Sequence, residues 1–489
     1  MKIYKYLVLS IVVSIFGCSD LEEEPIGLLA PDGFFNTTTD IQTATNAAYG
    51  HMTDGDLTTA SRRIDHDIFT VAADNGMIEG YWLRVYQIIA AANQAIAGAE
   101  LVNVEDEIKN PVTAQAYFAR AFAYFHLVRQ FGEVPYISGP ITDLDAESSI
   151  SKSSVPDVYA NIIADLEFAK TWLPNTQAAR SIPAKSAAHS YLALVYLTMG
   201  DYENAYKEAK GVIDNEGEYQ LGLEPDFQDL FDSSKIDGSI EPIFVLDYIG
   251  ISNGDEGRDY HAALTGLRDD EQYPTIIGGG WSVAVPSLEV YNSWDGRDYR
   301  KAVSLDTTAV FNGIVVPYTV FFESGNSGRG VNRPHIAKYT RGVSGKTTLT
   351  NGRGSETNYL MMRYAEVLLI AAEALNELSP GSTEAQNYVN RVRARARNGN
   401  GSSFPEDISS GLSQDDFRNA VLEERKWELA FEFKRWYDIA RRKMGTEVFG
   451  ASGLEGLKEN FDPNQDYLLP LLADELARNP NLEPQNPGY

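Results

Sequence analysis

Residues 113–131 read T-A-Q-A-Y-F-A-R-A-F-A-Y-F-H-L-V-R-Q-F, a run rich in alanine and aromatic residues without glycine or proline. This pattern predicts a largely buried helix, because nothing in it interrupts the backbone hydrogen bonds and its small residues let neighbouring helices approach. Asn110 and Pro111 are suited to start the helix, since Asn caps free N–H groups and Pro fits the first helical position. Gly132 is suited to end it.

Helical patterns continue on both sides of this run. Tyr81–Gly98 predicts a similar amphipathic helix. Residues 184–199 and 202–214 predict a helical hairpin that turns at Gly200 and Asp201. The small and aromatic positions of this hairpin have spacings that resemble a tetratricopeptide repeat, at Ala193, Tyr196 and Ala205.

The C-terminal third contains two further helical patterns. Residues 362–378 carry an apolar stripe with helical spacing, at Tyr364, Val367, Leu368, Ala371, Leu375 and Leu378. Residues 417–443 carry a comparable stripe, at Leu422, Leu429, Phe433, Trp436 and Ala440. The second stripe predicts one helix without a break.

Between these helical parts, residues 216–358 are rich in Gly, Asp, Asn and Ser and contain short β-branched runs, such as Ile243–Leu246 and Val315–Phe322. They predict loops and short strands laid over a helical frame, where a binding surface is expected. The fold class that follows is a single mostly α domain over 40–489. It would have a helical scaffold at about 40–215 and 359–445, a loop-rich binding region at about 216–358, and an irregular tail at 446–489.

The composition excludes several classes of protein. The chain has 489 residues, 43 % hydrophobic residues and a formal net charge of −28. That apolar content can bury a core, so global disorder is excluded. The strong acidity argues against nucleic-acid binding, which needs clustered Lys and Arg. One cysteine cannot form an intrachain disulfide, and no Cys/His cluster indicates zinc.

The N-terminus has the layout of a secretory signal. A basic start with Lys2 and Lys5 precedes a short apolar run at 6–17, which is too short to span a bilayer. Cleavage before Cys18 would resemble processing of a bacterial lipoprotein, with residues 1–17 removed and Cys18 lipidated. The acidic tether at 18–39, beginning S-D-L-E-E-E-P, resembles a surface-export signal of such lipoproteins. The alternative is a plain signal peptide with an incidental cysteine. Lipid on Cys18 would be the only membrane attachment.

Five segments together resemble the SusD/RagB family of nutrient-binding outer-membrane lipoproteins. These are the lipoprotein start, W-L-R-V-Y-Q-I-I-A-A-A-N at 82–93, the segment at 114–135, the segment at 359–397, and L-E-E-R-K-W-E-L-A-F-E-F-K-R-W-Y-D-I-A-R at 422–441 with the C-terminal end. The resemblance implies a tetratricopeptide-like scaffold, a SusC-like TonB-dependent transporter as partner, and capture of oligosaccharide or polysaccharide at the cell surface. In the RagB branch the ligand would be a peptide.

An enzyme, most plausibly a surface glycoside hydrolase, is the less favoured alternative. Glu423 and Glu424 are adjacent carboxylates, but they lie in a predicted structural helix, whereas hydrolytic acids must face each other across a bond. Gly278–Gly280 is followed by Trp281 and therefore lacks the phosphate-binding signature. Asp269–Glu271 lacks the spaced oxygen ligands of a recognised calcium loop. We therefore expect no catalytic residue, no metal and no cofactor.

Aromatic side chains are the expected ligand contacts, because a flat ring can stack on the apolar face of a sugar. Trp281 and Trp294 lie in the loop-rich region, and Trp82 opens a segment that follows a loop where the family places ligand contacts. We predict that these three tryptophans form a stacking platform. Further predicted contacts are Asp74, Asn75, Tyr81, Tyr260 and Tyr273. The net charge favours a neutral glycan.

Overall fold

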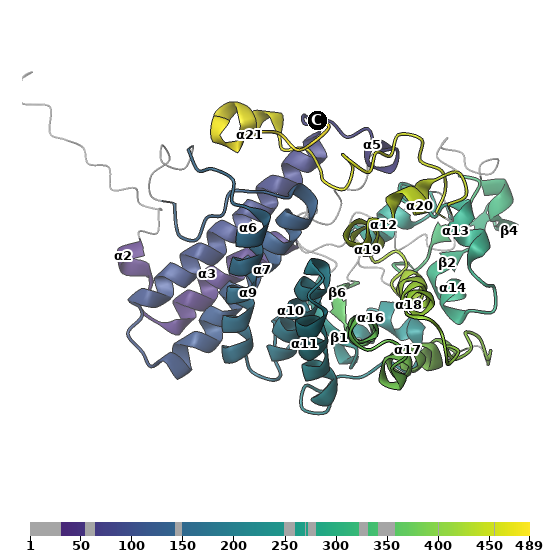
Figure 1. The fold of residues 1–489 in the computed structure, drawn as a ribbon, viewed down its shortest axis with the longest axis horizontal. Coiled ribbons are helices and arrows are strands. Elements are labelled where there is room, and N and C mark those ends of the chain that lie inside the picture. Colours follow the sequence, from purple (N-terminus) through teal and green to yellow (C-terminus); the bar gives the residue numbers. More distant parts are fainter. Residues whose placement is uncertain are drawn as a thin grey trace, which may run out of the picture.

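A computed structural model describes residues 31–53, 64–141, 149–248, 260–268, 270–271, 280–321, 331–340, 357–399, 401–453 and 455–489. The predicted signal peptide and Cys18 lie outside these residues. Figure 1 shows a mostly helical molecule with a few short strands, which confirms the predicted fold class.

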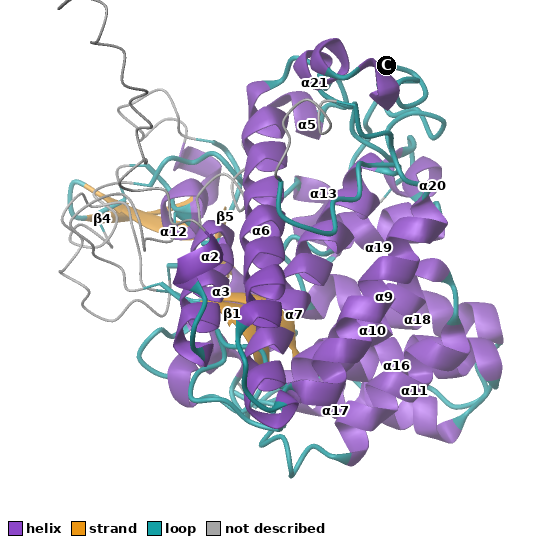
Figure 2. Ribbon diagram, turned by 90° about the vertical axis from the view of Figure 1, so that its left-hand side faces the viewer, coloured by secondary structure: helices purple, strands orange, loops and turns teal. Residues whose placement is uncertain are grey.

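The scaffold is a series of helices that follow one another along a curve, and most of them pack both on the next helix and on the one after it (Figures 1 and 2). After α11 (Tyr202–Asp214) the series continues directly onto α16 (Tyr364–Leu378), although about a third of the chain separates the two. Its members are α3 (Thr38–Met52), α6 (Gly76–Leu101), α7 (Asp106–Phe131), α9 (Val155–Trp172), α10 (Lys185–Met199), α11 (Tyr202–Asp214), α16 (Tyr364–Leu378), α17 (Thr383–Ala396) and α18 (Gln414–Glu428).

Helix α7 is the predicted buried helix, and it ends at Gly132 as expected, with that residue at φ 72°. Its predicted start is wrong. The helix begins at Asp106, and Pro111 lies inside it. The acidic residues Asp106 and Glu107 favour the earlier start, because they sit at the positive end of the helix dipole. Pro111 costs the helix a single backbone hydrogen bond close to its first turn.

The predicted hairpin is confirmed as α10 and α11. Gly200 adopts the left-handed conformation that ends α10, with φ 79°, and the Asp201 side chain accepts a hydrogen bond from Asn204 N to begin α11. Ala193 and Ala205 are fully buried, so the two helices approach closely. Tyr196 packs against the main hydrophobic core.

The helix predicted over residues 417–443 is broken, which corrects the sequence analysis. Helix α18 ends at Glu428, and α19 (Arg435–Arg442) begins after a turn. Within that turn Phe431 and Phe433 have positive φ values of 63° and 56°, which are rare for bulky residues. Apolar spacing could not reveal the break, because the tertiary contacts of the turn stabilise it.

The described residues of the loop-rich part, together with β6 (Tyr359–Arg363), form three two-stranded antiparallel pairs and several short helices. Strand β1 (Pro242–Leu246) pairs with β6 (Tyr359–Arg363), which brings the chain back to the scaffold just before α16. The other pairs are β2 (Leu305–Asp306) with β5 (His335–Ile336) and β3 (Thr308–Phe311) with β4 (Ile314–Pro317). The helical elements here are η2 (Phe227–Phe231), η3 (Ile236–Gly238), α12 (His261–Thr265), α13 (Leu288–Ser293), α14 (Tyr299–Ser304) and η4 (Tyr318–Val320).

Short elements complete the two ends of the described chain. These are α2 (Pro31–Phe34) and α5 (Ile64–Asp67) near the N-terminus, and α20 (Gly445–Phe449), α21 (Ala473–Arg478) and η5 (Pro480–Leu482) in the C-terminal tail. Among the described residues, none of the helices combines the length and the apolar character that a membrane crossing requires.

A buried ion-pair network joins the loop-rich part to the C-terminal helices. Glu424, Glu428 and Glu432 recur every four residues and contact cations from four other parts of the chain, which carry Arg300, Lys338, Arg363, and Arg393 with Arg395. Arg300 of α14 contacts Glu424 and Glu428, and Arg363 of β6 contacts Glu428 and Glu432. The acidic motif at 422–432 is therefore structural, which fits the expectation that Glu424 belongs to a structural helix.

Candidate functional site

Two of the three tryptophans predicted to form a stacking platform are buried, so the prediction that all three form it together is wrong. Trp82 is 7 % exposed and lies edge-on to Phe131, with ring centroids 5.0 Å apart. Trp294 is 1 % exposed, stacks on Trp427 at 4.8 Å and donates its indole N–H to Asp298. Both rings contribute to packing because they have aromatic partners inside the protein.

Trp281 is the partly exposed tryptophan of the three, and Tyr260 stacks on it. Their ring centroids are 5.9 Å apart and their planes differ by 17°. The Trp281 backbone N–H donates to Ala263 O, which fixes the segment against α12. This pair remains a predicted ligand contact. Tyr273, another predicted ligand contact, lies outside the described residues.

The remaining predicted contacts have different environments. Asp74 is exposed at the start of α6. Asn75 is buried and caps α6, because its side chain accepts a hydrogen bond from Met77 N at 3.0 Å; its amide also donates to Asp65. Its role is therefore to begin the helix. Tyr81 is buried as a residue, but it lines a large cavity.

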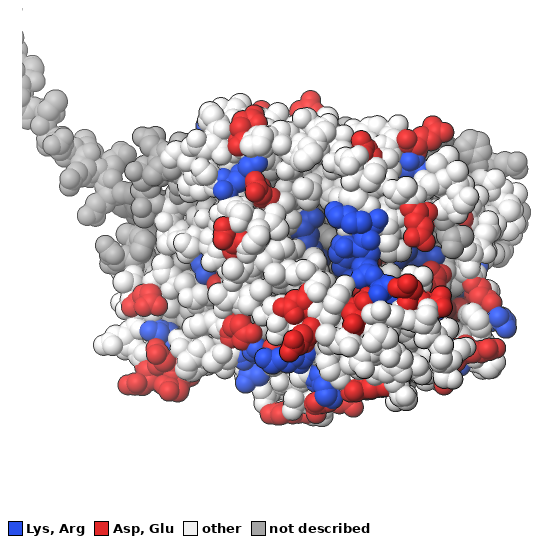
Figure 3. Space-filling view, viewed as in Figure 1, with Lys and Arg blue, Asp and Glu red and all other residues white. Residues whose placement is uncertain are grey.

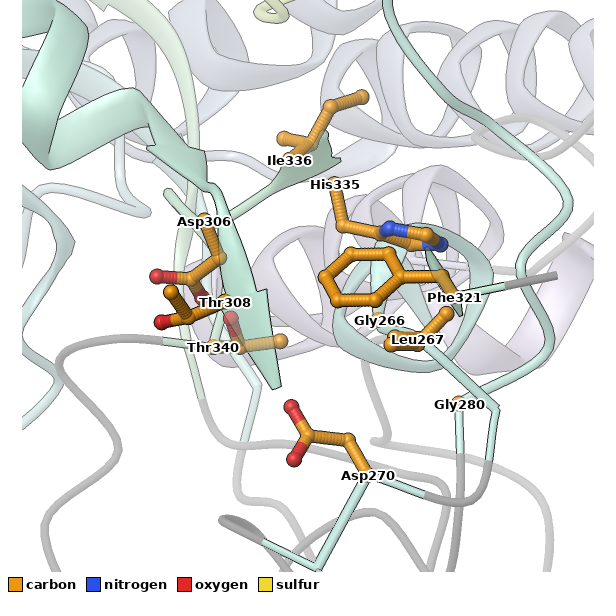
Figure 4. A pocket seen from close by; sticks show the side chains of 10 residues that line it. All are labelled: Gly266, Leu267, Asp270, Gly280, Asp306, Thr308, Phe321, His335, Ile336 and Thr340. Carbon is orange, nitrogen blue, oxygen red and sulfur yellow. The ribbon is translucent and has the colours of Figure 1, made fainter. Parts of the chain in front are cut away.

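Two hollows lie near these residues, and they differ greatly in size. The one in Figure 4 has a volume of only about 10 Å³, with the rings of Phe321 and His335 on one side and Asp306 and Thr308 on the other. That is room for about one water molecule. The second has a volume of about 620 Å³, within the roughly 300–1,000 Å³ typical of ligand sites. The second cavity is therefore the candidate site.

The large cavity lies between the N-terminal scaffold helices α6, α7 and α10 and the C-terminal segment 425–441, and the C-terminal tail completes its wall. Figure 3 shows that this face of the molecule is hollowed near its centre. Lys and Arg side chains gather beside the hollow, around α19, although acidic residues are spread over the rest of the face (Figure 3).

Aromatic side chains form much of the cavity wall. Trp436 is half-buried and packs with Phe69 and Tyr467, and all three line the cavity. Phe433 also lines it and is 40 % exposed. Sequence reasoning assigned Trp436 to the core and Phe433 to a helix stripe, and thus missed both. The signal that could have found them is their position in a segment of unusually dense aromatic residues.

The turn that carries Phe431 and Phe433 is held by hydrogen bonds from the loop-rich part. Tyr339 donates its hydroxyl to Phe431 O at 2.6 Å, and Tyr359 donates to Glu432 O at 2.9 Å. Arg363 Nε contacts Glu432 Oε2 at 2.9 Å. These bonds compensate for the positive φ values, which cost free energy and are often found at functional sites.

A polar cluster on α7 faces the aromatic wall. Gln130 donates to the hydroxyls of Tyr81 and Tyr437, at 2.6 and 3.0 Å. Tyr81 Oη is also 3.1 Å from His126 Nδ1. Burial and the charges of Arg129 and Lys434 lower the pKa of His126 well below its ordinary value, so the imidazole is neutral, and in the tautomer with a bare Nδ1 it accepts a hydrogen bond from the Tyr81 hydroxyl.

Most carboxylates of the cavity are already paired with cations. Asp438 lies between Arg425 and Arg441, and Glu366 contacts Arg425 and Lys434. Burial opposes ionisation of Asp438, but the two arginines lower its pKa overall, so it stays charged. Asp438 and Glu366 therefore do not form a pair of unpaired carboxylates that face each other.

Metal ligands are not gathered at this site. Within the described ranges, no group of three or more His, Cys, Asp or Glu side chains is arranged to hold a metal ion. Asp270 accepts a hydrogen bond from Val310 N, and Glu271 accepts from Asn312 N and Gly313 N. Both carboxylates therefore hold the β3–β4 hairpin.

Comparison with known proteins gives consistent matches along the chain. A family model described as the SusD family matches residues 323–489, and one described as "Starch-binding associating with outer membrane" matches residues 32–197. The SusD-like protein P2 of Formosa agariphila is 53 % identical over the full length of both chains.

Solved structures share the fold. A SusD homolog from Bacteroides thetaiotaomicron matches with a TM-score of 0.77 at 20 % identity, covering 94 % of this chain and 98 % of the other. A laminarin-binding SusD-like protein matches with a TM-score of 0.75 at 23 % identity, covering 93 % and 100 %. At these identities the likeness concerns the fold alone.

Proposed function

The chain belongs to the SusD family, and we propose that it binds an oligosaccharide or polysaccharide at the cell surface. The observation that carries the proposal is the cavity of about 620 Å³, in which an aromatic wall faces a polar cluster. A pyranose ring has apolar C–H faces and a rim of hydroxyls. Aromatic rings such as Phe433 and Trp436 suit the faces, and side chains such as Gln130 and Tyr437 suit the hydroxyls.

We place the protein at the outer membrane, anchored through lipid on Cys18, where it delivers the glycan to a SusC-like TonB-dependent transporter. The layout of residues 1–24 supports the anchor. The description of the family model at 32–197 supports association with the outer membrane. The laminarin-binding protein of the same fold supports a glycan as the ligand class.

We further propose that binding is not followed by cleavage. Hydrolysis needs one protonated acid and one free carboxylate on opposite sides of the scissile bond. Glu366, Glu432 and Asp438 are instead held in ion pairs with buried or half-buried cations. Asp466 has a pKa raised by burial, but its carboxylate accepts a hydrogen bond from Asp462 N.

Affinity electrophoresis through gels containing individual polysaccharides tests the proposal. We expect at least one polysaccharide to retard the protein. Phe433→Gly should reduce the retardation, because it removes a cavity ring while glycine accepts the positive φ of that position. Leu378→Gly, at an exposed apolar position on α16, is the control and should not change it. If no polysaccharide retards the protein and peptides bind to it, the glycan proposal is refuted and a peptide, as in the RagB branch, is the ligand.

A further inference from the structure

Arg129 has an unusual position in the cavity, because its guanidinium is enclosed between two aromatic rings. Its central carbon lies 3.8 Å from the centroid of Phe125 and 3.8 Å from that of Tyr437. Nε donates to Phe125 O at 3.1 Å. Both faces of the guanidinium and its Nε donor are thus occupied, so the group is held in a fixed orientation. Its two terminal amino groups remain available to a ligand.

No carboxylate compensates this charge among the residues that the structure describes. The other cavity-lining cations all have acidic partners: Arg425, Lys434, Arg435 and Arg441 contact Glu366, Asp438, Glu373 or Glu455. Glu366, Glu373, Asp438 and Glu455 are therefore already paired with other cations. A fixed guanidinium that lacks an internal partner and faces a cavity is suited to an external oxyanion, which its planar donor pair binds through two parallel hydrogen bonds.

We propose that Arg129 is a subsite for an oxyanion on the bound saccharide, either a carboxylate of a uronic acid or a sulfate ester. This inference rests on the proposed glycan binding. It also departs from the neutral glycan that the net charge of −28 favours. The preference at one subsite depends on the charges close to the ligand and not on the net charge of the chain. Figure 3 shows basic side chains beside this hollow, and Arg129 is the cavity-lining cation to which the described residues give no acidic partner. The Tyr437 hydroxyl, which accepts from Gln130, can donate its own hydrogen to the same anion.

Titration calorimetry at low ionic strength with two matched ligand pairs tests the subsite. The first pair is tetragalacturonate and its methyl ester, which differ only in the free carboxylates. The second pair is a carrageenan oligosaccharide and its desulfated form. We expect the charged member of at least one pair to bind about tenfold more tightly than its neutral counterpart. The pair that shows this preference identifies the oxyanion.

Substitutions assign the preference to Arg129. Arg129→Met should reduce the charged-to-neutral ratio to less than about twofold. Arg129→Lys keeps the charge without the planar fork and should leave an intermediate ratio; it also serves if the Met variant does not fold. Arg297→Met, at an exposed arginine paired with Asp295, is the control and should leave the ratio unchanged.

The outcomes separate this inference from the proposed function. If both members of each pair bind equally, or if Arg129→Met keeps the preference, the subsite is refuted while glycan binding stands. If none of the four saccharides binds and the polysaccharide gels also show no retardation, both are refuted. Binding of an acidic peptide in place of any saccharide would likewise refute both.

Discussion

The guanidinium of Arg300 and the carboxylate of Glu428 lie 2.9 Å apart, and both side chains are almost completely buried. Glu428 also contacts Arg363 and Arg395, so one carboxylate joins α14, β6 and α17. Burial opposes ionisation of Glu428, but the three arginines outweigh it and lower its pKa below the ordinary value. The loop-rich part of the molecule is thus attached to the scaffold through charges that water does not screen.

Removing this carboxylate should destabilise the protein strongly. Glu428→Ala leaves the positive charges of Arg300 and Arg363 buried without full compensation, which costs about 3–5 kcal/mol of unfolding free energy. Urea unfolding followed by circular dichroism measures the loss. Glu423→Ala, at a half-exposed residue that pairs with its helix neighbour Lys426, is the matched control and should cost less than about 1 kcal/mol. Equal losses in the two variants would mean that the network does not hold the fold.

Stability should also fall as the pH drops below about 6.5, because of buried histidines. Burial lowers the pKa of His335 to about 3. Between these two values the unfolded chain binds a proton that the native protein does not bind, so stability is present above pH 6.5 and is lost as pH falls, by about 1.4 kcal/mol per pH unit. Urea midpoints between pH 7.5 and 5 should show this slope. His335→Gln should reduce the slope by about 1.4 kcal/mol per pH unit, and the part that remains is expected from His126, whose pKa burial also lowers. A slope that His335→Gln leaves unchanged would contradict the assignment.

The tryptophans should divide into two classes. Trp294→Ala removes a fully buried ring and should cost about 3–5 kcal/mol of stability. Trp281→Ala removes a partly exposed ring and should leave the melting temperature nearly unchanged, but it should weaken glycan binding by about 1–3 kcal/mol if stacking on nucleic-acid bases is a fair guide. Thermal melts and binding titrations on both variants measure this division. A large loss of stability in Trp281→Ala would place that ring in the core.

Features that depend on local sequence were predictable, whereas those that depend on distant contacts were not. The α10–α11 hairpin and the body of α7 were predictable, because helix spacing, Gly200 and Gly132 are local signals. The break between α18 and α19 was not, because it depends on Tyr339, Tyr359 and other groups distant in sequence. The residues that line the candidate site could not be predicted for the same reason.

Exposure of an aromatic ring is decided by its tertiary neighbours, and sequence alone does not supply them. Trp294 is buried because Trp427 stacks on it from a distant helix. Phe433 lines the cavity because the chain turns there. From the sequence, Arg129 could be assigned only to a helix. Its enclosure was not predictable, because Phe125 lies on the same helix but Tyr437 comes from α19.

The proposed lipid anchor on Cys18 gives a cellular prediction. Cys18→Ala should release the protein from the outer-membrane fraction, because no other attachment to the lipid is expected from the sequence. Fractionation followed by immunoblotting compares the variant with the wild type. A matched Ser19→Ala variant should stay with the membrane. Full retention of Cys18→Ala would refute the lipoprotein assignment.

The central claim is that this chain binds a glycan in its large cavity and does not cleave it. Titration calorimetry of the wild-type protein with oligosaccharides from the polysaccharide that retards it most tests this directly, with the ligand recovered afterwards and its length measured. The account predicts saturable binding at one site per chain and recovery of the oligosaccharide at its original length. Absence of binding, or recovery of shortened chains with new reducing ends, would contradict it.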